Sequence, residues 1–203
     1  MKRKLSEIAQ ELNQQSGFNH LPGLIFITDQ YAQPCPERVI DQLPKDSMVI
    51  FRDYAHENRN ELGQALHYVA RARGIKFLVA GDLALTLMLD ADGIHLSEHL
   101  IPQVNDITKE HPNLFITASC HSIEAVQNAT VHNVDAVLLG PVFPTKSHPE
   151  TINKPKLTLG VGGLTEICGN TNIPIYALGG INRETAEKIT QSGATGIAAI
   201  RGI

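Results

Sequence analysis

Short apolar runs alternate with amphipathic stretches along the 203 residues of the chain. The apolar runs are typical of buried strands, and the amphipathic stretches of helices with one apolar face. The expected strands are residues 24–28, 48–51, 76–79, 93–96, 114–118, 136–139, 173–178 and 196–200. The expected helices between them are residues 36–43, 59–73, 82–89, 101–109, 123–131 and 182–191.

This alternation predicts a parallel sheet with helices between its strands. About eight strand–helix units, roughly 20–25 residues apart, favour a closed α/β TIM barrel, or (β/α)8 barrel, over an open sheet. No linker or change of composition divides the chain, so we expect a single domain over residues 1–203.

One further amphipathic helix is expected before the first strand, over residues 5–14, with Leu5, Ile8, Ala9 and Leu12 on its apolar face. The last expected strand is followed by Arg201, Gly202 and Ile203 alone, so the barrel lacks a C-terminal helix. That gap would expose an apolar groove. We expect the N-terminal helix to fill it, against the flank of the last and first strands.

Charge and composition narrow the classes of partner. A net charge of −4 provides no basic surface for nucleic acid. No run of about 18 apolar residues is present, so we expect no membrane span. Three widely separated cysteines show neither metal nor disulfide spacing, and the basic N-terminus lacks the apolar core of a signal peptide. We therefore expect a cytoplasmic protein.

Two turns near the C-terminus are candidates for binding phosphate. Gly179 and Gly180 follow the seventh expected strand, and Arg201 and Gly202 follow the eighth. Paired glycines allow a bound group to approach backbone N–H donors, and the loops after strands seven and eight of a TIM barrel are the usual phosphate cradle. An ordinary tight turn without a ligand would have the same sequence pattern.

Polar residues at other strand ends have two interpretations each. Arg52 contacts a phosphorylated ligand, or it pairs with Asp53 or Glu57. Asp82 holds Mg²⁺ against diphosphate oxygens, or it caps the next helix. His95 takes part in the chemistry, or it is a core histidine with satisfied hydrogen bonds.

The end of the fifth strand and the longest connection carry further candidates. Ser119, Cys120 and His121 are adjacent, so their side chains point to opposite faces and do not form a nucleophile set. We expect His121 to cap the following helix. The connection over residues 141–156 is long and polar, which is typical of a functional or mobile loop.

Four segments resemble thiamine phosphate synthase and its TenI-like relatives: residues 92–96 (DGIHL), 119–122 (SCHS), 140–145 (GPVFPT) and 173–182 (IPIYALGGIN). The resemblance runs from about residue 24 to the end of the sequence. It implies a (β/α)8 barrel. The synthase joins hydroxymethylpyrimidine diphosphate to a thiazole phosphate and releases pyrophosphate with Mg²⁺. The TenI-like branch tautomerises a thiazole carboxylate phosphate.

The resemblance also implies roles for individual residues. The catalytic residues would be Arg52, His95, Ser119 and Lys146. The residues that bind substrate and phosphate would be Thr145, Ser147, His148, Gly179, Gly180, Arg201 and Gly202. Mg²⁺, weakly held, would lie on Asp82 and Glu98. The partners would be the phosphorylated thiazole and pyrimidine substrates, with a homodimer as a possible assembly.

Departures from the family pattern are concentrated in the diphosphate half of the site. Tyr54 stands in place of the lysine of a Gln-x-Arg-x-Lys run, and Gly81 in place of the asparagine of an Asn-Asp pair. The second Mg²⁺ aspartate falls near Leu100. Arg201 replaces a serine in the thiazole phosphate half. Three hypotheses remain: a synthase, a TenI-like tautomerase in which His95 or His121 moves protons, and a degenerate barrel that only binds a phosphorylated ligand.

Overall fold

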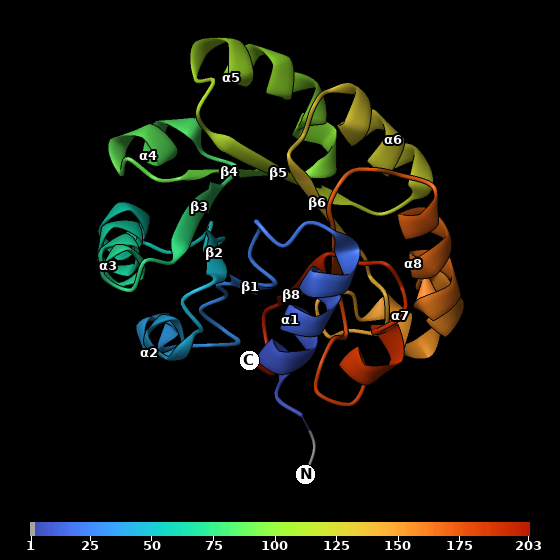
Figure 1. Ribbon diagram of the computed structural model, residues 1–203. Helices are drawn as coiled ribbons and strands as arrows, with labels where there is room; N and C mark the ends of the chain where they lie inside the picture. The colour runs from blue at the N-terminus through green and yellow to red at the C-terminus, as the bar shows by residue number, and fades with distance from the viewer. Residues whose placement is uncertain (1–2) are drawn as a thin grey trace.

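The protein is a closed barrel of eight parallel strands, each paired with its neighbours in sequence order and β8 with β1. A computed structural model describes residues 3–203. Figure 1 shows the strands following one another around a ring, with the helices outside it. The strands are β1 (Leu24–Ile27), β2 (Ser47–Phe51), β3 (Lys76–Ala80), β4 (Gly93–Leu96), β5 (Phe115–Cys120), β6 (Ala136–Leu139), β7 (Ile175–Leu178) and β8 (Gly196–Ala199).

The helices form the outer layer and differ more in length than the strands do. The α-helices are α1 (Leu5–Ser16), α2 (Pro36–Gln42), α3 (Arg59–Ala72), α4 (Leu83–Met88), α5 (Val104–Glu110), α6 (Ile123–Val131), α7 (Glu150–Asn153) and α8 (Gly160–Gly169). In the described part of the chain, three short 3-10 helices accompany them: η1 (Glu98–Gln103), η2 (Pro155–Leu157) and η3 (Ala186–Ile189). The TIM barrel expected from the sequence is confirmed.

Successive residues along each strand point alternately into two apolar layers. One layer fills the barrel interior and includes Ile25, Ile50, Leu138 and Tyr176, all fully buried. The other lies between the strands and the surrounding helices. The hydroxyl of Tyr176 donates a hydrogen bond of 2.6 Å to the carbonyl of Pro22, which satisfies the polar group inside the barrel.

Helix α1 lies beside β8 and β1, as Figure 1 shows. Its first residue, Leu5, shares a cavity with Gly202 and Ile203 beyond β8. Near its other end, the buried Asn13 side chain donates to the carbonyl of Thr195, just before β8, at 3.4 Å. The helix therefore runs antiparallel to β8, as a helix following β8 would. The prediction that it packs against the flank of β8 and β1 is confirmed.

Two segments differ from the helices expected in the sequence. Residues 160–169 form α8, which the pattern did not predict because four of its ten residues are glycine, a weak helix former. Residues 182–191 were expected to be one helix, yet only Ala186–Ile189 is helical there, as the 3-10 helix η3. Within the described residues, no helix is long and apolar enough to cross a membrane.

Candidate functional site

A cavity of about 360 Å³ opens at the carboxyl ends of β6, β7 and β8. Residues that line it include Arg52, His121, Gly140, Thr145, Lys146, Ser147, His148, Gly179, Gly180, Asn182, Arg201 and Gly202. The structure therefore brings together every residue that the sequence assigned to substrate and phosphate binding, together with Arg52 and Lys146. Asn182 was not assigned a role, although it directly follows the glycine pair and Ile181.

Both glycines of the turn after β7 are required by their surroundings. Gly179 has a φ of 91° and Gly180 a φ of 67°, in the left-handed region that favours glycine. A Cβ atom on Gly179 would lie 2.7 Å from the Cα of Pro141, and one on Gly180 would lie 2.6 Å from the carbonyl oxygen of Pro144. The loop after β6 therefore packs directly on this turn, so close packing alone requires both glycines.

Backbone donors at this end of the barrel remain available for a ligand. Among the described residues, the N–H groups of Gly180, Arg201 and Gly202 donate to no acceptor. All three residues line the cavity. Because several N–H groups at one edge form a favourable environment for an anion, this arrangement suits a phosphate group.

Three cationic side chains add positive charge to the cavity. Arg201 and Lys146 are exposed and pair with no carboxylate in residues 3–203. Arg52 is half-buried, and its Nη2 lies 2.8 Å from Oδ2 of Asp29. The alternative in which Arg52 pairs with Asp53 or Glu57 is therefore wrong. Asp29, at the end of β1, is the partner that fixes Arg52 at the cavity.

The loop between β6 and α7 is held by a buried threonine. The N–H of Thr145 donates to Oγ1 of Thr151 at 3.0 Å, and the Thr151 hydroxyl donates to the carbonyl of His148 at 2.6 Å. The N–H of His148 donates to the carbonyl of Thr145 at 3.1 Å, which closes a turn. Lys146 and Ser147 lie within this turn, which hydrogen bonds close at the wall of the cavity.

His121 contributes an imidazole to the same cavity. Its Nδ1 lies 2.6 Å from the carbonyl oxygen of Gly140, so Nδ1 carries the hydrogen and Nε2 is left as an acceptor in the neutral ring. The ring of His148 lies edge-on at 6.1 Å between centroids. The expected capping role of His121 is wrong, because Ser122 caps α6 by accepting from the N–H of Ala125.

His95 and Ser119 lie together, apart from this cavity. The ring of His95 is buried, with Nδ1 2.9 Å from Oγ1 of Thr117 and Nε2 3.0 Å from Oγ of Ser119. Burial, and to a smaller extent the charge of Arg52, lowers the pKa of His95 from 6.5 to about 4. His95 is therefore neutral near pH 7, with both ring nitrogens partnered.

The two carboxylates expected to hold Mg²⁺ are already engaged. Asp82 caps α4, with Oδ1 accepting from the N–H of Leu85 at 2.9 Å, which confirms the capping interpretation. Its Oδ2 lies 2.7 Å from Nη1 of Arg59. Oε2 of Glu98 accepts from the N–H of His121 at 3.0 Å. Residues 3–203 contain no group of three or more metal-ligating side chains, and this arrangement does not fit a metal ion.

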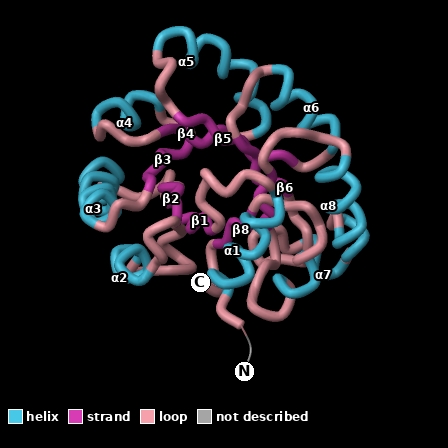
Figure 2. The backbone as a smooth tube through the Cα atoms, in the orientation of Figure 1, coloured by secondary structure: helices cyan, strands magenta, loops and turns pink. Residues whose placement is uncertain are grey.

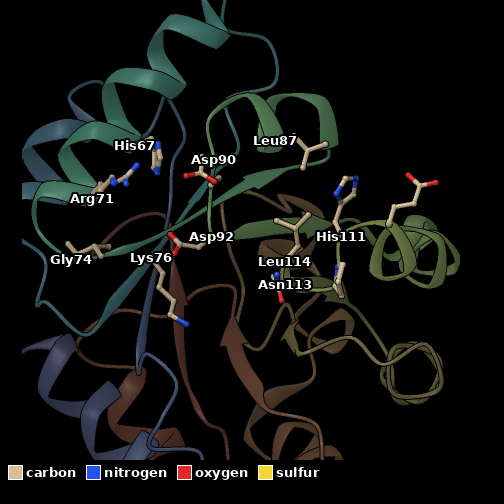
Figure 3. Close-up of a pocket in the computed structure, with 14 residues that line it drawn as sticks. His67, Arg71, Gly74, Lys76, Leu87, Asp90, Asp92, His111, Asn113 and Leu114 are labelled. Carbon is tan, nitrogen blue, oxygen red and sulfur yellow. The ribbon is translucent and has the colours of Figure 1, made fainter.

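A larger groove, of about 850 Å³, lies at the opposite end of the barrel. Figure 3 shows acidic and basic side chains side by side along it, among them Arg71, Lys76, Asp90 and Asp92. The groove borders the first residue of β3 and the residue before β4. It is thus separate from the carboxyl ends of the strands, where TIM barrels carry their active sites.

Comparison with known proteins identifies the family to which the chain belongs. The family model described as "Thiamine monophosphate synthase" matches residues 24–203. A protein of Aquifex aeolicus named "Putative thiamine-phosphate synthase 2" is 32% identical over 185 residues, which cover 89% of this chain and 96% of that protein. The "Thiamine-phosphate synthase" of Pyrococcus furiosus is 31% identical, with 89% and 86% covered.

A solved structure gives the same result. The "Thiamine phosphate pyrophosphorylase" from Pyrococcus furiosus superposes with a TM-score of 0.72 and 25% identity, over 95% of this chain and 87% of that one. The barrel, its carboxyl-terminal cavity and a family match over residues 24–203 lead to one conclusion: the chain belongs to the thiamine monophosphate synthase family.

Proposed function

We propose that this protein joins a thiazole phosphate to hydroxymethylpyrimidine diphosphate, forming thiamine phosphate and releasing pyrophosphate. The observation that carries the proposal is the cavity at β6–β8, where the unpaired N–H groups of Gly180, Arg201 and Gly202 meet an unpaired Arg201 guanidinium. We assign the phosphate of the thiazole substrate to these donors, because charge-assisted hydrogen bonds to phosphate are among the stronger ones.

The reaction needs stabilisation of a leaving group and the correct placement of a nucleophile. The bond between the pyrimidine methylene carbon and the diphosphate oxygen breaks, and its electron pair leaves with pyrophosphate. The thiazole nitrogen then uses its lone pair to form the new bond to that carbon. Arg52, Lys146 and Ser147 line the cavity beside the phosphate donors, where their positive charge and hydroxyl would stabilise the departing diphosphate.

His95 and Ser119 would act from the barrel interior. The neutral, buried imidazole would hold the Ser119 hydroxyl in place, and the resemblance assigns that hydroxyl to the diphosphate. The resemblance implies Mg²⁺ at Asp82 and Glu98, but the hydrogen bonds of these two carboxylates do not favour it. The cytoplasmic location and the homodimer stay predictions. Because Asp82 is paired with Arg59, stabilisation of the departing diphosphate would fall to Arg52, Lys146 and Ser147.

One observation favours a second candidate, the tautomerisation of a thiazole carboxylate phosphate. Nε2 of His121 is an acceptor at a cavity suited to phosphate, and such a nitrogen can remove and return a proton. His95 is less suited to this role, because both of its nitrogens are partnered.

Incubation of the protein with both synthase substrates, followed by chromatography, tests the proposal. We expect thiamine phosphate to accumulate. Replacing Arg201 with alanine should weaken binding of the thiazole phosphate by roughly 1–3 kcal/mol, seen as a higher KM. Arg38→Ala is the matched control, since Arg38 is exposed on α2 and does not line the cavity. Absence of product, with thermal stabilisation by the thiazole phosphate, would instead identify a protein that only binds this ligand.

A further inference from the structure

The loop after β2 and the end of β3 interlock around one guanidinium group. Arg59, the first residue of α3, donates from Nη1 to Oδ2 of Asp82 at 2.7 Å and from Nη2 to the carbonyl of Ala80 at 2.8 Å. Its guanidinium carbon lies 5.3 Å from the ring centre of Phe51 and 5.4 Å from that of Tyr54. Two hydrogen bonds and two aromatic rings therefore fix this cation on Asp82.

Two departures from the family pattern belong to this cluster. Tyr54 stands where a lysine is expected, and Gly81 where an asparagine is expected. A Cβ atom on Gly81 would lie 3.2 Å from Cε1 of Tyr54, and Gly81 has a φ of 65°. The tyrosine ring and the glycine thus fit each other. The two replacements pack together with Arg59 and Asp82 as one unit. They are therefore linked changes and not two independent losses of ligand-binding groups.

This unit uses the carboxylate oxygens that a metal would need. Oδ1 of Asp82 accepts from the N–H of Leu85, and Oδ2 is bound by Arg59. The Arg59 side chain is only 14% exposed. If Asp82 bound a metal ion instead, the charge of Arg59 would be left mostly buried and without its partner. Removing the partner of such a charge is costly, whereas the pair as it stands is neutral, with both terminal nitrogens of Arg59 bonded and only its Nε buried without a partner among the described residues.

We propose that Arg59 is the resident cation of Asp82, and that this protein binds the diphosphate end of its substrate without a metal ion on Asp82. Asp82 is then a positioning residue. It joins the start of α3 to the start of α4, and so holds the loop that carries Arg52 at the cavity. This inference rests on the proposed function, because a diphosphate is the ligand of that half of the site.

Calorimetric titration with inorganic pyrophosphate tests the inference without turnover. The affinity is measured in excess MgCl2 and in excess chelator, for the wild type and for Asp82→Asn. Pyrophosphate itself binds Mg²⁺, so the informative quantity is the ratio of the two affinities. We expect the same ratio, within twofold, in both proteins. A ratio that favours Mg²⁺ by tenfold or more in the wild type, and that Asp82→Asn removes, would overturn the proposal.

Variants of Arg59 supply the second arm. Arg59→Met frees Asp82. In this variant we expect Mn²⁺ to strengthen the binding of pyrophosphate, an effect that the wild type lacks. The double variant Arg59→Met/Asp82→Asn should lose the effect again. Arg59→Lys, which retains a cation, should behave as the wild type. An equal Mn²⁺ response in wild type and Arg59→Met would contradict the inference. Failure of the synthase assay with these binding results intact would reject the proposed function and leave the role of Arg59 standing.

Discussion

The imidazole of His95 shows how burial fixes a protonation state at the level of one residue. Its two hydroxyl partners, on Thr117 and Ser119, accept or donate according to the tautomer, so a neutral ring is fully satisfied. A proton added to this ring would place a charge inside the barrel and close to the charge of Arg52. The neutral form is therefore built into the native state.

This makes the stability of the protein depend on pH in a predictable direction. Between about pH 4 and 6.5 the unfolded chain holds a proton on residue 95 that the native state does not, so stability falls as the pH is lowered through this window. At about 1.4 kcal/mol per pKa unit, the loss attributable to His95 is about 3 kcal/mol. Urea unfolding from pH 4 to 8 should show a shallower dependence in His95→Asn. Parallel curves for the two proteins would show that His95 does not titrate in this way.

The expectation that site residues follow the carboxyl ends of the strands identified the residues of the cavity, but it did not predict their contacts. Arg52, Gly180 and Arg201 were predicted at the cavity, because each lies one or two residues beyond the end of a strand and all strands of a parallel barrel end on one face. The partners of Arg52 and Asp82 were not predicted. Asp29 and Arg59 are each 23 residues away in the sequence, and only the closed barrel brings them within hydrogen-bond distance.

At the level of elements, α1 behaves as part of the barrel wall. Ile8 and Ala9 are fully buried, and the carbonyl of Ala9 would lie 2.8 Å from a Cβ atom on Gly23, so the helix packs closely on the chain just before β1. Arg3 adds ion pairs to Glu11 and to Glu187 of η3. The helix is therefore anchored by a buried face and by a link to the segment that follows β7.

Ile8→Ala should destabilise the protein by roughly 2–5 kcal/mol, because it leaves a cavity between α1 and the strands. Gln10→Ala, at an exposed position of the same helix, should change the free energy of unfolding by about 0.5 kcal/mol or less. Urea unfolding of both variants measures these differences. Equal effects of the two substitutions would mean that α1 contributes little to the barrel.

Helices were predicted less completely than strands for a physical reason. A buried strand shows in the sequence as an apolar run, whereas α8 has the sequence GVGGLTEICG, where glycines hide the periodicity. Its burial comes from Leu164 and Ile167, which pack on the rest of the core. After β7, the side chain of Asn182 accepts from the N–H of Thr185. This local turn competes with a regular helix there.

At the scale of the whole molecule, the number of strand–helix units was sufficient to predict a closed barrel. Strand pairing follows sequence order around the ring, and β8 returns to β1 with Leu24 opposite Ile197. The same closure places the loops after β6, β7 and β8 around one cavity. These loops pack on each other, as Pro141 does against Gly179, only when the ring is complete. A short stretch of sequence therefore does not predict this packing.

The position of α1 has a consequence for the order in which the chain is made. The helix is synthesised well before its partner β8, which follows it in the sequence by about 180 residues, so its apolar face lacks this partner until β8 has been made. A circular permutant removes this delay. A short glycine–serine linker joins Ile203 to Lys4, because these two residues line the same cavity, and the new chain ends lie within residues 17–20. We expect this permutant to unfold in one cooperative transition and to refold faster than the natural order, since its helix follows its partner strand directly. Stopped-flow refolding compares the two, and a permutant that aggregates or refolds more slowly would show that an early, unpartnered α1 helps the barrel to form.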